Sequence, residues 1–168
     1  MNNNDNLRDT LSTWLKDAYA MEQGIVEILE RQIDQFEDMP EAQMKIRQHL
    51  ELTRDQAERV RECVERLGDD VSRVKSGMAN VLGAVQGMST ALANDKMVKN
   101  SMGNYAIEHF EIASYMILVT AAWEMGYEEI ALVCEGILGE EQEMAQWVEQ
   151  SLPLVTRAHL SMRINDRS

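Results

Sequence analysis

Two glutamates stand at the start of the most apolar stretch of the chain. Glu108 and Glu111 are three residues apart, so a helix places them on one face. No charged residue occurs from Ile112 to Trp123, which indicates that the helix is buried there. A buried carboxylate is costly unless it is protonated, paired or bound to a metal ion. Unless the pair is protonated, the side chains that face it must therefore help to neutralise it or to bind a metal ion with it.

Three other segments also carry a glutamate on or beside an apolar stripe. Glu22 continues a stripe of leucine and alanine at helical spacing, Glu141 follows Ile137 by four residues, and Glu51 lies beside its stripe. Amphipathic helices normally keep glutamate off the stripe, so the recurrence indicates a shared interior site, although Glu22 could instead reach water from the stripe's edge. Carboxylate oxygens bind Fe, Mn or Zn. The candidate metal ligands are Glu22, Glu51, Glu108, Glu111 and Glu141.

Apolar periodicity predicts four long helices to position these glutamates. They run from about residue 6 to 37, 41 to 67, 95 to 125 and 127 to 152. Residues 71–95 contain three glycines and predict a short, imperfect crossover helix. The expected fold is all-α, an antiparallel four-helix bundle. We expect the bundle to occupy residues 1–152 and a C-terminal tail to follow in residues 153–168.

Composition agrees with a helical protein and excludes several functions. Only two prolines and nine glycines argue against a loop-rich β protein, and a net charge of −13 argues against nucleic-acid binding through a basic surface. There is no glycine-rich phosphate loop. Cys63 and Cys134 are far apart and predict reduced, buried thiols. With no segment of signal-peptide or membrane-span length, we expect a cytoplasmic protein without a membrane partner.

Three segments resemble the bacterial YciE/YciF stress-protein family (DUF892). They are His109–Tyr115, Trp14–Glu22 and Gln48–Glu51, within a likeness that covers most of residues 7–150. This family is a ferritin-like branch related to rubrerythrin. The resemblance implies a homodimer of ferritin-like bundles, each with a centre of two Fe or Mn ions. It implies as ligands, from the first helix to the fourth, Glu22, Glu51, the pair Glu108 and Glu111, and Glu141, with Glu140 as its alternative.

Two nitrogen ligands of the family pattern are absent. A histidine is expected three residues after Glu51 and after Glu141, where this chain has Arg54 and Met144. Either metal binds in an all-carboxylate cage with less selectivity for iron, or Arg54 replaces the cation in a buried network with Glu51. One guanidinium cannot neutralise five carboxylates, so the second alternative requires some of them to be protonated or to leave the core.

Two functions remain open at this point. The first is a ferritin-like di-metal protein of the bacterial stress response that handles oxidants or metal. The alternative is a non-catalytic helical dimer with a degenerate metal site, acting as a structural or interaction module. No catalytic residue is assigned: Tyr115 is interpreted as a buried tyrosine with one hydrogen bond rather than a redox group. His109 points about 100° away from Glu108 on a helix and is interpreted as satisfied or exposed.

Overall fold

The computed structural model describes residues 3–37, 39–74 and 96–165, and these residues contain helices and turns but no strand. Helix α1 spans Asn3–Gln32 and continues as the 3-10 helix η1, Ile33–Phe36. Helices α2, α4 and α5 span Pro40–Arg66, Lys96–Glu124 and Glu128–Asn165. The predicted all-α class and its four long helices are confirmed. The predicted crossover helix, residues 71–95, falls mostly outside the described residues, and residues 71–74 form a bend and turn.

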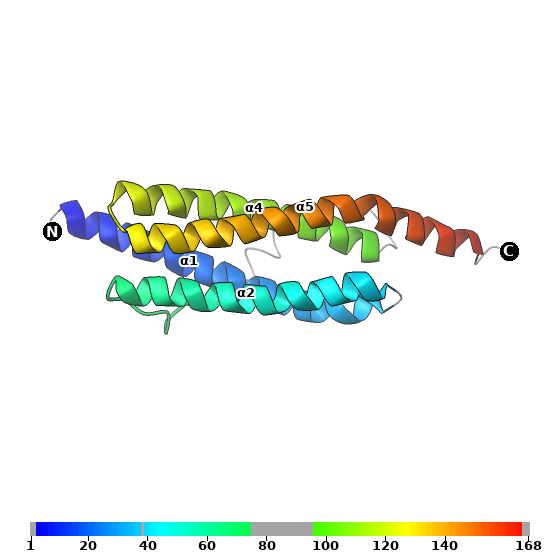
Figure 1. Cartoon of the computed structure of the whole chain (residues 1–168). Helices are drawn as coiled ribbons and strands as arrows, with labels where there is room; N and C mark the ends of the chain where they lie inside the picture. Colours follow the sequence, from blue (N-terminus) through cyan, green and yellow to red (C-terminus); the bar gives the residue numbers. More distant parts are fainter. Residues whose placement is uncertain (1–2, 38, 75–95, 166–168) are drawn as a thin grey trace.

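The helices form two antiparallel hairpins that pack against each other (Figure 1). Helix α1 packs mainly along α2, and α4 packs mainly along α5. The hairpins meet where α1 contacts α4 and where α2 contacts α5. Helices α2 and α4 run in the same direction in Figure 1, so a long connection between them is required, as the sequence predicts.

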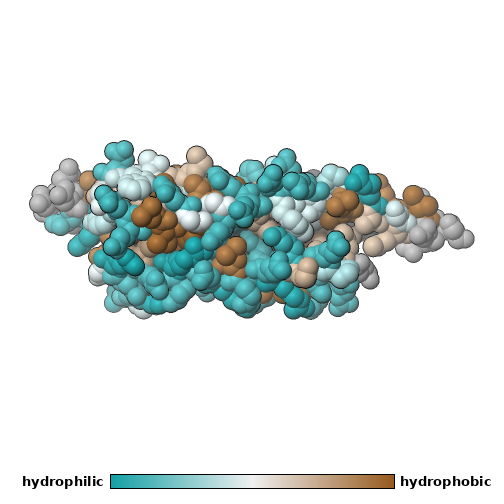
Figure 2. Space-filling model, viewed as in Figure 1, coloured by the Kyte–Doolittle hydropathy of each residue, from teal (hydrophilic) through white to brown (hydrophobic). Residues whose placement is uncertain are grey.

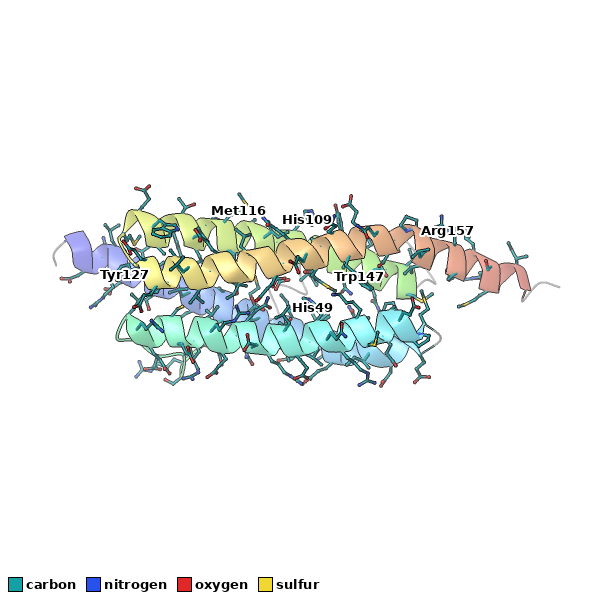
Figure 3. All side chains as sticks on the ribbon, in the orientation of Figure 1. His49, His109, Met116, Tyr127, Trp147 and Arg157 are labelled. Carbon is teal, nitrogen blue, oxygen red and sulfur yellow. The ribbon has the colours of Figure 1, made fainter. Side chains whose placement is uncertain are left out.

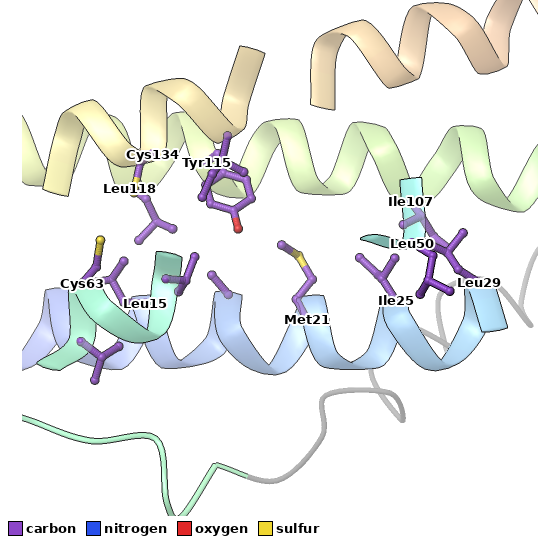
Figure 4. Packing of buried hydrophobic residues seen from close by; sticks show 14 of the residues in the cluster. Leu15, Met21, Ile25, Leu29, Leu50, Cys63, Ile107, Tyr115, Leu118 and Cys134 are labelled. Carbon is purple, nitrogen blue, oxygen red and sulfur yellow. The ribbon is translucent and has the colours of Figure 1, made fainter. Parts of the chain in front are cut away.

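Each helix buries the apolar stripe that its sequence predicts. Leu11, Leu15 and Ile25 of α1 and Ile137 of α5 are at most 1% exposed. Close packing of these stripes forms one continuous core along the bundle (Figure 4). The glutamates that share these stripes are therefore carried into the same core.

Glycines end α2 and α4 where the sequence predicts. Gly68 and Gly126 have φ values of 78° and 75°, a conformation that glycine adopts without strain. The Gly126 amide donates to the Trp123 carbonyl at 3.0 Å, and the Tyr127 amide donates to the Ala122 carbonyl at 2.8 Å. This pair of bonds satisfies carbonyls at the end of α4 and allows the chain to turn directly into α5.

The last helix is longer than predicted. The apolar pattern predicts an end near Leu152, before Pro153, but α5 continues through Pro153 to Asn165 and extends beyond the other helices (Figure 1). Pro153 removes one backbone donor to Glu149, and both residues are exposed, so water can satisfy the Glu149 carbonyl. Val155, just beyond the proline, is buried and anchors the continuation of the helix.

The two cysteines are free and buried, as expected. Burial raises the pKa of the Cys63 thiol to about 11 and that of Cys134 to about 12, which keeps both thiols protonated. Figure 2 shows a mainly hydrophilic face with separate hydrophobic patches. Among the helices that the structure describes, none has the length and apolarity needed to cross a membrane.

Replacing Gly126 by alanine should destabilise the protein by about 1 kcal/mol, because alanine adopts a positive φ only at a cost. A Cβ at this position meets no atom within 4 Å, so steric overlap does not contribute. Gly139 lies inside α5 and is equally open. Gly139→Ala should leave stability unchanged or raise it, because alanine favours helix. Thermal unfolding checks both variants, and equal losses in the two would contradict the assignment of Gly126 as a helix cap.

Candidate metal centre

Four of the five predicted glutamates meet in the interior of the bundle. The side chains of Glu22 from α1, Glu108 and Glu111 from α4, and Glu141 from α5 come from residues that are 0–2% exposed. Each occupies a stripe position, one helical step from apolar neighbours that pack in the core. Burial of three helices' stripes thus brings four carboxyl groups into one water-poor volume.

Helix α2 contributes a histidine that the sequence analysis did not select. His49 is 2% exposed, and its Nε2 atom lies 3.1 Å from Oε1 of Glu108. One ligand atom from each of His49, Glu108 and Glu141 lies within 4.8 Å of the others, close enough for one ion to contact all three. His49 lies on the side of α2 that faces α5 (Figure 3).

The expectation that Glu51 joins this cluster is wrong. Its side chain is 71% exposed, and its Oε1 atom pairs with Nη1 of Arg54 at 2.5 Å. Nη2 of Arg54 pairs with Glu30 at 2.6 Å, also at the surface. A buried network in which Arg54 replaces the cation is therefore excluded by the same geometry.

The apolar stripe of α2 explains both the error and the missed residue. From Leu50 to Ala57 the stripe passes through Thr53, which is buried, whereas Glu51 and Arg54 lie to its side. His49 and Gln56 are seven residues apart and follow the inner flank of this stripe. His49 stands four residues before Thr53, and Gln56 stands three residues after it. This helical spacing is the sequence signal that these polar side chains of α2 point inward.

Two hydrogen bonds orient carboxyl groups of the cluster. The Tyr115 hydroxyl donates to Oε1 of Glu22, and the close view shows this hydroxyl pointing toward α1 (Figure 4). This confirms the interpretation of Tyr115 as a buried tyrosine with a hydrogen bond. Nε2 of Gln56 donates to Oε1 of Glu141 and, at 3.0 Å, to Oε2 of Glu140. Glu140 turns toward Arg59, 2.5 Å away, so Glu141 and not its neighbour enters the core.

The neighbouring histidine and methionine behave as the sequence analysis expects. His109 is exposed, and its Nδ1 atom lies 3.1 Å from the carbonyl of Tyr105 in its own helix. Met144, one turn after Glu141, is 4% exposed, so a buried thioether occupies the position where the family pattern has a nitrogen ligand. His49 is the imidazole that the cluster does contain.

Most of the polar atoms in the cluster have no hydrogen-bond partner. The buried atoms without one include Oε2 of Glu22, Glu108 and Glu141, both oxygens of Glu111, and both ring nitrogens of His49. Folded proteins rarely leave buried polar atoms unsatisfied. Oxygen and imidazole donors are the ligand types that Fe, Mn and Zn accept, so the residues present fit a metal centre.

Burial and repulsion from neighbouring charges raise the pKa values of Glu22, Glu111 and Glu141. Burial, followed by the Glu22 and Glu108 charges, raises the pKa of Glu141 to about 10. Burial raises the pKa of Glu22 to about 8, although the Tyr115 hydrogen bond opposes this effect. Burial, with Glu141, Glu22 and Glu108 nearby, holds the pKa of Glu111 well above its ordinary value. Without a cation, the cluster therefore retains protons at neutral pH, and a cation would displace them.

The chain matches the model of the family described as domain of unknown function DUF892 over residues 6–161. This match spans most of the sequence, so the chain belongs to that family. A protein from Xanthomonas campestris of known structure is 33% identical, with a TM-score of 0.79, over 94% of this chain and 98% of that one.

Two other solved structures show the same fold at lower identity. The Escherichia coli stress protein YciF is 22% identical, with a TM-score of 0.76, over 90% of this chain and 97% of that one. A bacterioferritin from Desulfovibrio desulfuricans, described with a diiron site, is 18% identical, with a TM-score of 0.75, over 94% of this chain and 86% of that one. The bundle is therefore ferritin-like, as the resemblance implies.

The metal-free protein should lose stability as pH rises from 5.5 to 8.5. The folded-state pKa values of Glu22 and Glu141, about 8 and about 10, exceed the ordinary value of 4.5, so the folded state holds protons that the unfolded chain has released. Unfolding free energy then falls as pH rises through this window. Thermal unfolding in the presence of a chelator measures the slope.

Glu111→Gln should flatten this pH dependence and stabilise the metal-free protein at pH 8 by roughly 1–3 kcal/mol, because a buried amide is neutral without taking up a proton, whereas Glu111 must be protonated when the chain folds. Glu51→Gln is the matched control and should leave the slope unchanged, because Glu51 is exposed. A chelated protein whose stability stays constant or increases from pH 5.5 to 8.5 would contradict the electrostatic description of the cluster.

Proposed function

We propose that this ferritin-like protein binds two Fe or Mn ions at Glu22, His49, Glu108, Glu111 and Glu141. The observation that carries the proposal is the set of buried, unpaired oxygen and nitrogen atoms on these five residues. The grouping of His49, Glu108 and Glu141 supports it further. Four carboxylates carry four negative charges when ionised, which two divalent cations balance.

The protein's own residues would hold and shield such a centre. Tyr115 fixes one oxygen of Glu22 and leaves the other for a cation, and Gln56 does the same for Glu141. Glu108 lies 3.1 Å from Nε2 of His49 and groups with Glu141, so it could bind the same ion as both residues. Leu118 and Ile137 are at most 2% exposed and limit the access of water. Bound Fe or Mn would supply one-electron redox chemistry in this setting.

We propose a role in oxidant or metal handling during bacterial stress, in the cytoplasm. The structural similarity to the stress protein YciF supports the stress role, and the similarity to a bacterioferritin with a diiron site supports the metal. Protonated, buried thiols are compatible with a reducing compartment.

The alternative is a structural or interaction module in which the metal site has degenerated. Its specific support is that α2 presents Thr53 and Gln56 to the interior, and that Thr53 donates to the carbonyl of His49 at 3.0 Å and not to a carboxylate. Buried Met144 also supplies no hard ligand. In this alternative, protons and not cations neutralise the carboxyl groups.

Metal content separates the two functions. Protein purified without chelator should contain about two Fe or Mn per chain by elemental analysis, and Glu108→Gln with Glu111→Gln should abolish this content, because four ligand atoms are removed or neutralised. Glu51→Gln should retain the full content, because its side chain is exposed. An equal metal content in the double variant and in the parent protein would show that the metal lies elsewhere.

We also propose that the protein forms a homodimer through the face between α1 and α4. Trp14, Phe110 and Ile117 are 41–57% exposed there and line an apolar groove of about 380 Å³. Clustered large apolar side chains are uncommon on the surface of a monomer. Both large exposed side chains and the small Ala18 line the groove, so two copies related by a two-fold axis can interdigitate there.

Ile117→Glu should convert the dimer to a monomer, because it places a charge at the centre of the apolar contact. Light scattering during size-exclusion chromatography measures the mass. Leu132→Glu on α5 is the control, because Leu132 is 58% exposed but does not line the groove. A protein that is monomeric before mutation, or a dimer that survives Ile117→Glu, would rule out this interface.

A further inference from the structure

A small cavity opens between α2 and α5 and ends at the carboxylate cluster. It measures about 100 Å³ and is lined by Lys45, Gln48, His49, Leu52, Glu140, Glu143 and Met144. A volume of this size admits a hydrated or partly hydrated ion but no organic substrate of ordinary size. Two larger cavities in the described part of the protein, of about 380 and 390 Å³, include none of the five cluster residues among their lining side chains.

The inner end of the cavity is the imidazole of His49. This side chain is 1% exposed, and its Nδ1 atom has no hydrogen-bond partner. Its Nε2 atom lies 3.1 Å from Oε1 of Glu108. The ring therefore lines the cavity and also contacts one of the buried carboxyl groups.

The outer end of the cavity carries two glutamates of unequal availability. Glu140 pairs with Arg59 and accepts a hydrogen bond from Gln56, so the guanidinium already balances its charge. Glu143 is exposed at the edge of the cavity. The Lys45 ammonium lies 5.9 Å from the centre of the Trp147 ring, where the ring face attracts it. Glu143 is thus the carboxylate that faces an incoming cation first.

We propose that this cavity is the route by which divalent cations reach the interior, with Glu143 as the first binding group and His49 as the inner one. The inference rests on the proposed metal-binding function. A cation attracted by Glu143 exchanges water for an imidazole nitrogen at His49, and Glu108 and Glu141 lie within reach of the same ion. The negative charge of the whole protein raises the local concentration of cations at the opening.

The test measures the rate of Mn²⁺ uptake and its final stoichiometry separately. Metal-free protein is mixed with Mn²⁺ in a stopped-flow instrument, and a fluorescent chelator reports the free ion. Glu143→Lys should slow uptake about tenfold at low ionic strength while the final stoichiometry stays unchanged, and added salt should reduce the difference. Because Glu143 is exposed, the substitution should leave the fold intact, and circular dichroism verifies this.

Glu149→Lys is the matched control. Glu149 is exposed on the same helix and does not line the cavity, and its substitution by lysine makes the same change in charge. Its uptake rate should stay within twofold of the parent's. Equal slowing in both variants, or an unchanged rate in Glu143→Lys with normal stoichiometry, would overturn the route alone. Failure of the parent protein to take up any Mn²⁺ would overturn the proposed function and the route together.

Discussion

The constraint on which the structure depends is the burial of four carboxyl groups in one water-poor volume. Glu22, Glu108, Glu111 and Glu141 are all 0–2% exposed, and burial together with neighbouring negative charges raises the pKa values of Glu22, Glu111 and Glu141. Such a cluster is stable only when protons or cations neutralise it. The four helices can pack around these groups because a bound cation, or a proton shared between carboxyl groups, removes the repulsion between the carboxylates.

The two hairpins contribute unequally to this arrangement. Helices α1, α4 and α5 supply all four carboxylates, whereas α2 supplies His49 and Gln56. A fifth carboxylate from α2 would leave an excess negative charge beside two divalent ions. An imidazole and an amide add no negative charge, and Glu51 lies at the surface with Arg54. The histidine expected three residues after Glu51 would stand at position 54, which lies at the surface. Its absence therefore removes no ligand from the interior.

Sequence patterns predict most of the fold because each helix has a complete apolar stripe and glycines end two of them. They also identify the site glutamates on α1, α4 and α5, because Glu22, Glu111 and Glu141 interrupt the apolar stripes of those helices. They fail at α2, where the resemblance selects Glu51 although helical spacing through Thr53 selects His49. They fail again at Pro153, because burial of Val155 after the proline depends on tertiary packing that a local pattern does not contain.

A crystal structure grown with Mn²⁺ and phased by anomalous scattering at the manganese edge would locate any bound ions. We expect anomalous peaks inside the bundle, with oxygen ligands from Glu22, Glu108, Glu111 and Glu141 and a nitrogen ligand from His49. Peaks confined to surface carboxylates, or an interior whose glutamates remain paired only through protons at saturating Mn²⁺, would contradict this expectation.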